Sequence, residues 1–211
     1  MLWIAGVCII CLGVCLPLFM YYKRSLLLHL AVAFKMLGTL CAFLLALIAA
    51  IRLDPHCYIC AGALLLYAVA DLFIEYNLFT GMGFFLAGHI CSIAFFLNLA
   101  PVSVFHLICL LLLAGSMAYI FYRWRKTIGR QMTVMAVYGA SLLLMVDCAV
   151  SCFSLHTITG IRIACGGALF CISDFMLLRR LLFPSGRMIS WMIMILYYTA
   201  LLLFGTACLM L

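Results

Sequence analysis

The sequence predicts an all-α integral membrane protein, a bundle of eight transmembrane helices. The chain has 211 residues, of which 71% are hydrophobic and only 8% are charged. Soluble domains carry about 25% charged residues, so this composition does not suit a globule in water. Apolar runs long enough to cross a bilayer, each about 20 residues, recur along the whole chain. We therefore expect a single transmembrane domain over residues 1–211, with no room for a soluble domain.

Short polar, basic or proline-containing stretches separate the expected spans. The first span ends before Lys23 and Arg24, and the second ends at residues 52–55, which read Arg-Leu-Asp-Pro. Pro101 closes the fourth, and a basic loop at 123–130 divides the fifth from the sixth. The loops are short, so successive helices should pack antiparallel. The expected spans are about 2–21, 25–51, 57–79, 81–99, 102–122, 131–153, 160–182 and 187–211.

The distribution of basic residues predicts the orientation. The loops after the first, third, fifth and seventh spans hold most of them: Lys23, Arg24, Arg123, Arg125, Lys126, Arg130, Arg179, Arg180 and Arg187. The opposite loops hold only Arg52 and Arg162. By the positive-inside rule both termini should face away from the cytosol. The net charge of +7 thus reflects topology, and no nucleic-acid partner is expected.

The ends of the chain suggest a location. No cleavable signal peptide is expected, because the first residues carry no basic segment and the first apolar run is long enough to span. The minimal loops and termini favour a bacterial inner membrane, with the endoplasmic reticulum as the location if the source is eukaryotic.

Thirteen cysteines are present, most of them inside apolar runs. Cys57-x-x-Cys60 has the spacing of a redox or metal motif, but no second ligand pair lies at a suitable distance. Buried cysteine behaves as a small apolar residue, so helix packing is the favoured interpretation.

Ionisable residues inside four of the spans predict a functional site. Counted from the cytosolic helix ends, Lys35, Asp71, His89 and Asp174 should share a depth of about 12–15 Å. Tyr138 of the sixth span and Tyr197 or Tyr198 of the eighth are expected at a similar level. A charged side chain at the centre of a spanning helix costs at least about 2.5–3.5 kcal/mol to insert. These groups must therefore either pair as a structural ion-pair network or line a polar cavity, and the cavity is favoured.

The ionisable residues of the expected cavity suit acid and base catalysis. Two carboxylates in one low-dielectric site do not both ionise readily, so Asp71 and Asp174 suit general acid and base catalysis. Lys35 would hold one of them ionised or bind a lipid phosphate, and His89 would orient a carboxylate or move a proton. Glu75, one turn beyond Asp71, is expected at the cavity rim.

Other chemistries are less well supported. A metal site of His89, Asp71 and Asp174 is disfavoured because only one histidine lies in the layer, so no metal or cofactor is expected. The chain has no Gly-x-Ser-x-Gly elbow and no phosphate-binding loop of the Walker type. Asp147 lies deeper, toward the outer side.

Five stretches with polar or glycine residues follow one another along the chain: Lys35-Met36, 70–74, 81–89, 167–174 and 197–201. Their order and spacing resemble the lysoplasmalogenase family, the YhhN-like multi-pass membrane proteins. That family has a lysine, usually before proline, in its second span, a Gly-Asp-x-x-Leu stretch, a Gly-x-x-x-Phe-x-x-x-His stretch, a late stretch ending in Ser-Asp, and a final Tyr-Tyr-x-Ala-Gln. Met36, Ala70 and Leu201 depart from the pattern but leave the acid and base candidates in place.

The resemblance implies an enzyme that hydrolyses the vinyl-ether bond of a lysoplasmalogen, giving a fatty aldehyde and a glycerophospho-alcohol. Asp71 and Asp174 would divide the roles of proton donor and anion, in an order that the sequence leaves open. Basic residues such as Arg179, Arg180, Arg123 or Lys126 would attract the phosphate or anchor the membrane surface. The alternative is a proton-coupled transporter of a lipid or small molecule, because buried Asp, His and Lys also build proton relays.

Overall fold

The structure, a computed structural model, describes residues 2–100 and 104–211, and within them every regular element is helical. The α-helices are α1 (Leu2–Ile9), α2 (Leu16–Arg24), α3 (Leu28–Arg52), α4 (Cys57–Ile74), α5 (Leu78–Leu99), α6 (Val104–Ile128), α7 (Met132–Ser151), α8 (Ile158–Leu182) and α9 (Arg187–Cys208). A π-helical stretch, Ile10–Cys15, joins α1 and α2 into one continuous rod. The predicted all-α class is confirmed for this part of the chain.

Seven of the described helical segments are long and apolar enough to cross a membrane. One of them, Leu107–Leu155, contains most of α6 and all of α7. These two helices reverse direction at Gly129, whose φ of +58° is the left-handed conformation that glycine adopts without strain. The chain is therefore a multi-pass helical membrane protein.

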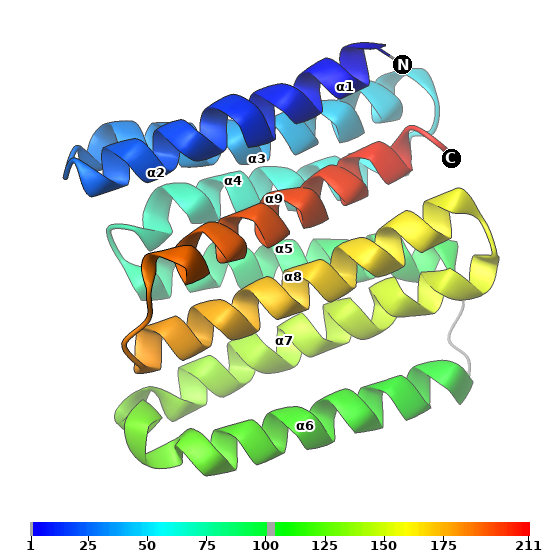
Figure 1. Cartoon of the computed structure of the whole chain (residues 1–211). Coiled ribbons are helices and arrows are strands. Elements are labelled where there is room, and N and C mark those ends of the chain that lie inside the picture. The colour runs from blue at the N-terminus through cyan, green and yellow to red at the C-terminus, as the bar shows by residue number, and fades with distance from the viewer. Residues whose placement is uncertain (1, 101–103) are drawn as a thin grey trace.

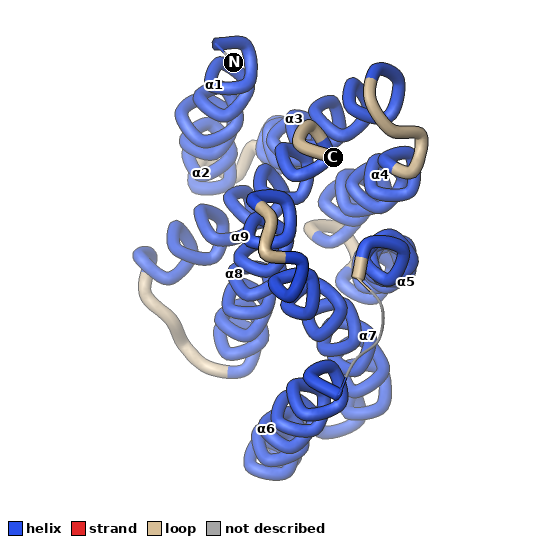
Figure 2. Tube along the Cα trace, turned by 90° about the vertical axis from the view of Figure 1, so that its right-hand side faces the viewer, coloured by secondary structure: helices blue, strands red, loops and turns tan. Residues whose placement is uncertain are grey.

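The helices lie side by side, with α3, α4 and α9 at the centre (Figure 1). α2 packs against α3, α5 against α4, and α8 against α9, while α7 fills the space between α5 and α8. Among the described helices α6 packs mainly against α7 and lies at the edge of the bundle (Figure 2). Both termini lie at the same end (Figure 1).

Small residues let the central helices approach closely. A Cβ atom at Gly205 of α9 would lie 2.5 Å from the carbonyl oxygen of Ala42 of α3. A Cβ atom at Gly38 would lie 2.6 Å from the ring of Tyr198. Interfaces of this kind are typical of helices in lipid, where close van der Waals packing drives association. This packing brings the middle of α9 against the part of α3 that carries Lys35.

The turn between α4 and α5 differs from the prediction. Spans were expected at 57–79 and 81–99, but α4 ends at Ile74 and α5 begins at Leu78. The Asn77 side chain caps α5 by accepting hydrogen bonds from the backbone amides of Phe79 and Thr80, at 3.0 and 3.2 Å. Asparagine is among the best N-cap residues. The turn is short and lies between two apolar runs, so the hydropathy pattern does not reveal it.

The α6 boundary is also different. The predicted span 102–122 places Arg123, Arg125 and Lys126 in a loop, whereas α6 continues to Ile128 and includes them in its last turns. Positions 102 and 103 of that predicted span lie outside the described residues. The other expected span ends differ from the helix ends by a few residues, as where α9 ends at Cys208 and not at residue 211.

Candidate active site

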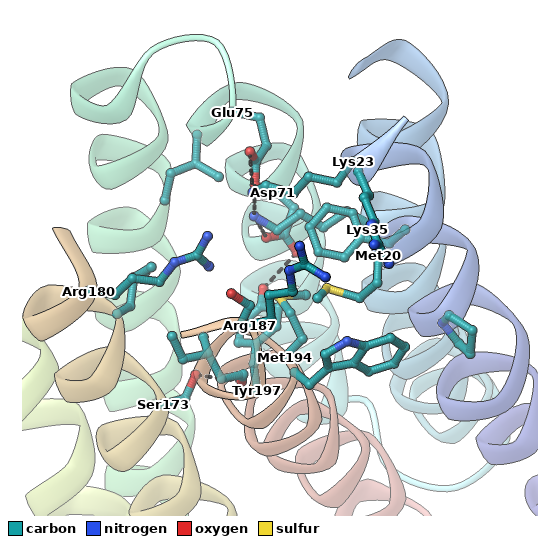
Figure 3. Close-up of a pocket in the computed structure, with 18 of the residues that line it drawn as sticks. Met20, Lys23, Lys35, Asp71, Glu75, Ser173, Arg180, Arg187, Met194 and Tyr197 are labelled. Atoms are coloured by element: carbon teal, nitrogen blue, oxygen red, sulfur yellow. Dashed lines mark hydrogen bonds and ion pairs between the residues drawn. The ribbon is translucent and has the colours of Figure 1, made fainter. Parts of the chain in front are cut away.

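A cavity of about 390 Å³ opens among α2, α4, α8 and α9, at the end of the bundle opposite the termini. Asp71 and Asp174 both line it, together with Lys35, Glu75 and Tyr197. Its remaining basic lining residues lie at helix ends: Lys23, Arg24, Arg180 and Arg187. Figure 3 shows Arg180 and Arg187 pointing toward the same space as the charged groups of α2, α3 and α4.

Asp71 lies at the inner end of a dense set of polar contacts. Its side chain is buried, and the Lys35 ammonium nitrogen lies 3.4 Å from Oδ1. The hydroxyls of Thr39 and Tyr197 donate hydrogen bonds to Oδ2, at 2.5 and 2.8 Å. Oδ1 accepts no hydrogen bond from a described residue, and its charged neighbour is the Lys35 ammonium.

A chain of charges leads from Lys35 to the cavity mouth. Lys35 donates to Glu75 Oε1 at 3.2 Å, and Lys23 donates to both oxygens of Glu75, at 2.8 and 2.7 Å. Glu75 lies just beyond the end of α4. Burial opposes ionisation of this carboxyl, but the Lys35 and Lys23 ammonium groups outweigh burial and lower the pKa of Glu75 to about 2. Glu75 is therefore an anion between two cations.

Asp174 has different surroundings. It receives a hydrogen bond from the Tyr138 hydroxyl, and no lysine, arginine or histidine of the described chain lies within ion-pair distance of it. One carboxyl of the cavity thus has a cation beside it and the other does not. Opposite charge favours an ionised carboxylate, so the two aspartates are suited to different chemical roles.

A second cavity, of about 340 Å³, lies among α6, α7 and α8 and the adjoining ends of α4 and α5. Asp174 and Tyr138 line it, and nearly all of its other lining residues are apolar. Asp174 consequently borders both cavities.

His89 and Tyr198 lie behind the cavities. His89 is fully buried, its Nδ1 is 3.1 Å from the Ser141 hydroxyl, and its ring centroid is 5.3 Å from that of Tyr138. It is not among the described residues that line either cavity. Tyr198 donates to the backbone carbonyl of Lys35 at 2.9 Å, so it acts on the position of Lys35. Of the tyrosines expected near the acids, Tyr197 and Tyr138 contact them directly.

The predicted common depth is wrong in detail. Asp71 lies three residues before the end of α4 at Ile74, about 5 Å along the axis, because α4 ends sooner than expected. His89 lies eleven residues beyond the start of α5 at Leu78, about 17 Å from the same end of the bundle. The polar residues thus lie at different depths, from Asp71 near the cavity mouth to His89 near the centre of the bundle.

Sequence reasoning missed Thr39, and it gave Lys23, Arg24 and Arg187 no role in this site. Thr39 follows Lys35 by four residues on α3, a spacing that places both on one helix face and was available from the sequence. Lys23 was interpreted only as a topology signal, and its contact with Glu75 joins residues 52 positions apart.

The cysteine motif makes packing contacts. Cys57 and Cys60 are buried, and the Cys57 thiol contacts the carbonyl of Cys208 at 3.8 Å. Within the described ranges no three His, Cys, Asp or Glu side chains are placed to hold a metal ion together.

Comparison with known proteins gives one result that bears on the whole chain. The family model described as the YhhN family matches residues 30–207, which include Lys35, Asp71, Asp174 and Tyr197. No curated protein and no solved structure matches the chain. Because the family model covers most of the 211 residues, the chain belongs to the YhhN family, the family that contains lysoplasmalogenases.

Proposed function

We propose that this protein is a lysoplasmalogenase, a membrane hydrolase that cleaves the vinyl-ether bond of lysoplasmalogens to a fatty aldehyde and a glycerophospho-alcohol. The observation that carries the proposal is the pair Asp71 and Asp174, two carboxyls in unlike surroundings on the wall of one cavity. Membership of the YhhN family supports the same reaction.

The surroundings of the two aspartates suggest how they divide the work. Lys35 beside Asp71 favours the anion there. Asp174, with no such cation among the described residues and an apolar cavity on one side, is the better proton donor. In this assignment Asp174 is the general acid, and Asp71 stabilises positive charge and later accepts a proton from water.

The reaction then runs through defined proton transfers. Asp174 gives its proton to the vinyl carbon β to the ether oxygen, and an oxocarbenium ion forms at the α carbon. Water adds to that carbon as Asp71 takes one of its protons, which leaves a hemiacetal. The hemiacetal hydroxyl gives its proton to Asp174 as the bond to the glycerol oxygen breaks, and Asp71 gives its proton to that leaving oxygen. The two carboxyls end with one proton between them, as they began.

The basic rim fits the phosphate of the substrate headgroup. Arg180, Arg187, Lys23 and Arg24 line the mouth of the cavity. Glu75 neutralises part of the Lys23 charge, which leaves the arginines as the main attraction for an anion. Arg123 and Lys126, considered for this role on sequence grounds, are not among the described lining residues of this cavity.

The proposed topology has eight passes, with both termini away from the cytosol. At 1.5 Å per residue α6 and α7, of 25 and 20 residues, are each long enough to cross a bilayer. The basic cavity end would face the cytosol. A bacterial inner membrane is the favoured location, with the endoplasmic reticulum as the eukaryotic equivalent. No cofactor is required by the proposed steps.

The test is an assay of purified protein in detergent with lysoplasmenylethanolamine and, in parallel, its acyl analogue. We expect aldehyde from the vinyl ether and no fatty acid from the ester. Retention of full activity in both Asp71→Asn and Asp174→Asn would refute the proposed acid and base. Uptake of lipid into sealed vesicles with no hydrolysis product would instead identify a transporter.

A further inference from the structure

We infer that the apolar cavity among α6, α7 and α8 is the subsite for the hydrocarbon chain of the substrate, so that the reacting group lies where this cavity meets the polar one. The inference deepens the proposed function and rests on it for the identity of the bond that reacts. The occupant is a single alkyl or alkenyl chain of a lipid.

The lining of the cavity suits a hydrocarbon. Its polar members among the described residues are Ser116, Tyr138 and Asp174. The Ser116 hydroxyl donates to the Leu113 carbonyl at 2.7 Å, and the Tyr138 hydroxyl donates to Asp174, so these two donors are already used. A charged or strongly polar ligand would lose its hydration there without partners in return. An aliphatic chain has no such hydration to lose, and removing its apolar surface from water favours binding.

The two cavities share three lining residues, Ile74, Asp174 and Leu177. One cavity carries the basic rim and the Lys35–Asp71 pair, and the other is almost wholly apolar. A molecule with a charged head on one side of the reacting bond and a chain on the other matches this division. Asp174 then lies beside the bond that joins the two halves.

Methionines give the apolar cavity an adaptable wall. Met82, Met117 and Met135 contribute to its lining, from α5, α6 and α7. Unbranched thioether side chains adjust to ligands of different length and shape. α6, which packs mainly against α7, forms one side of the cavity.

Gly139 of α7 offers a way to fill the cavity. It lines the cavity, and a Cβ atom there would already lie 2.9 Å from the Met117 sulfur. Gly139→Leu therefore occupies space that we assign to the chain. Ala140→Leu is the matched control, because its neighbour Ala140 is exposed on the same helix and does not line the cavity.

The experiment uses an acyl lysophospholipid with a diazirine at the end of its chain, photolysed with the purified protein in nanodiscs. We expect labelled peptides from α6 and α7 around Met117 and Met135, strong loss of that labelling in Gly139→Leu, and none of that loss in Ala140→Leu. If Gly139→Leu fails to fold, Met117→Phe fills the same space from α6. With vinyl-ether substrates, the filled variant should lose about fourfold in apparent affinity for each methylene excluded.

Two outcomes overturn the inference. Labelling of the outer face of α6, at Leu111 and Leu112, that Gly139→Leu leaves unchanged would place the chain in bulk lipid. A dimer in detergent, measured by size-exclusion chromatography with light scattering and lost in Gly139→Leu, would identify a subunit interface at this cavity. Because the probe is an ester and need not react, failure of aldehyde release refutes the proposed function alone, and failure of labelling refutes the chain subsite alone.

Discussion

The ammonium nitrogen of Lys35 lies 3.4 Å from Oδ1 of Asp71, and both side chains are buried. A buried ion pair adds little to stability relative to apolar residues of the same size, but removal of one partner leaves an uncompensated charge. This pair lies on the wall of a cavity whose second aspartate has no such cation. The pair is thus better explained by a function than by a contribution to folding.

A double substitution separates stability from function at this pair. Lys35→Met alone should destabilise the protein by about 3–5 kcal/mol, because Asp71 is left buried without its cation. Adding Asp71→Leu should recover most of that loss, while aldehyde release stays abolished. Thermal unfolding in detergent and the aldehyde assay measure the two effects. A double variant as unstable as Lys35→Met would show that the pair is required for folding.

Asp174→Asn should lower kcat by about 10²–10⁴-fold, the usual contribution of a general acid, because the amide keeps the shape but has no acidic proton. KM should change little. Asp54→Asn is the matched control, since Asp54 lies in the exposed turn after α3, where it bonds to His56 and lines neither cavity. Equal rates in the two variants would remove Asp174 from the mechanism.

Glu75 predicts a pH dependence of stability. Folding lowers its pKa from an ordinary value of 4.5 to about 2, so its contribution is fully present above pH 4.5 and is lost as the pH falls toward 2. The difference in melting temperature between wild type and Glu75→Gln should be constant from pH 7 to about 5 and should shrink below that. A difference that does not change down to pH 2 would contradict the ion-pair chain from Lys23 to Lys35.

Two glycine substitutions test the packing that positions Lys35. Gly38→Ala should destabilise the protein by about 1–3 kcal/mol, because the new methyl group meets the Tyr198 ring at 2.6 Å. Gly62→Ala is the control within α4, where nothing lies within 4 Å of the added Cβ. It should leave the protein as stable or raise its stability by up to about 1 kcal/mol, since alanine favours helix. Thermal unfolding measures both, and equal shifts would contradict the close contact at Gly38.

The sequence predicts the helical class and names most residues of the site because both depend on local signals. Asp71, Asp174 and Lys35 are conspicuous in apolar runs, because a charged side chain inside a membrane is costly and usually has a function. Their arrangement depends on features that hydropathy does not register. α4 ends at Ile74 and Asn77 caps the start of α5, so Asp71 lies closer to the cavity mouth than the span pattern implies.

Contacts between residues far apart in the chain could not be predicted from the sequence. The bond from Tyr138 to Asp174 and the pair of Lys23 with Glu75 depend on which faces of the helices meet. Histidine is a residue type that often acts in catalysis, yet His89 packs behind Tyr138 with its Nδ1 near the Ser141 hydroxyl. One sequence does not distinguish a histidine that lines a cavity from one that supports its wall.

The central claim is that the two aspartates hydrolyse a vinyl ether by protonation at carbon. The most direct measurement is turnover of lysoplasmenylethanolamine by the purified protein in deuterated water, with mass spectrometry of the aldehyde. The proposed mechanism predicts a single deuterium at the carbon next to the aldehyde group, and almost no product from Asp174→Asn. Aldehyde without that deuterium, or no aldehyde from the wild-type protein, would contradict it.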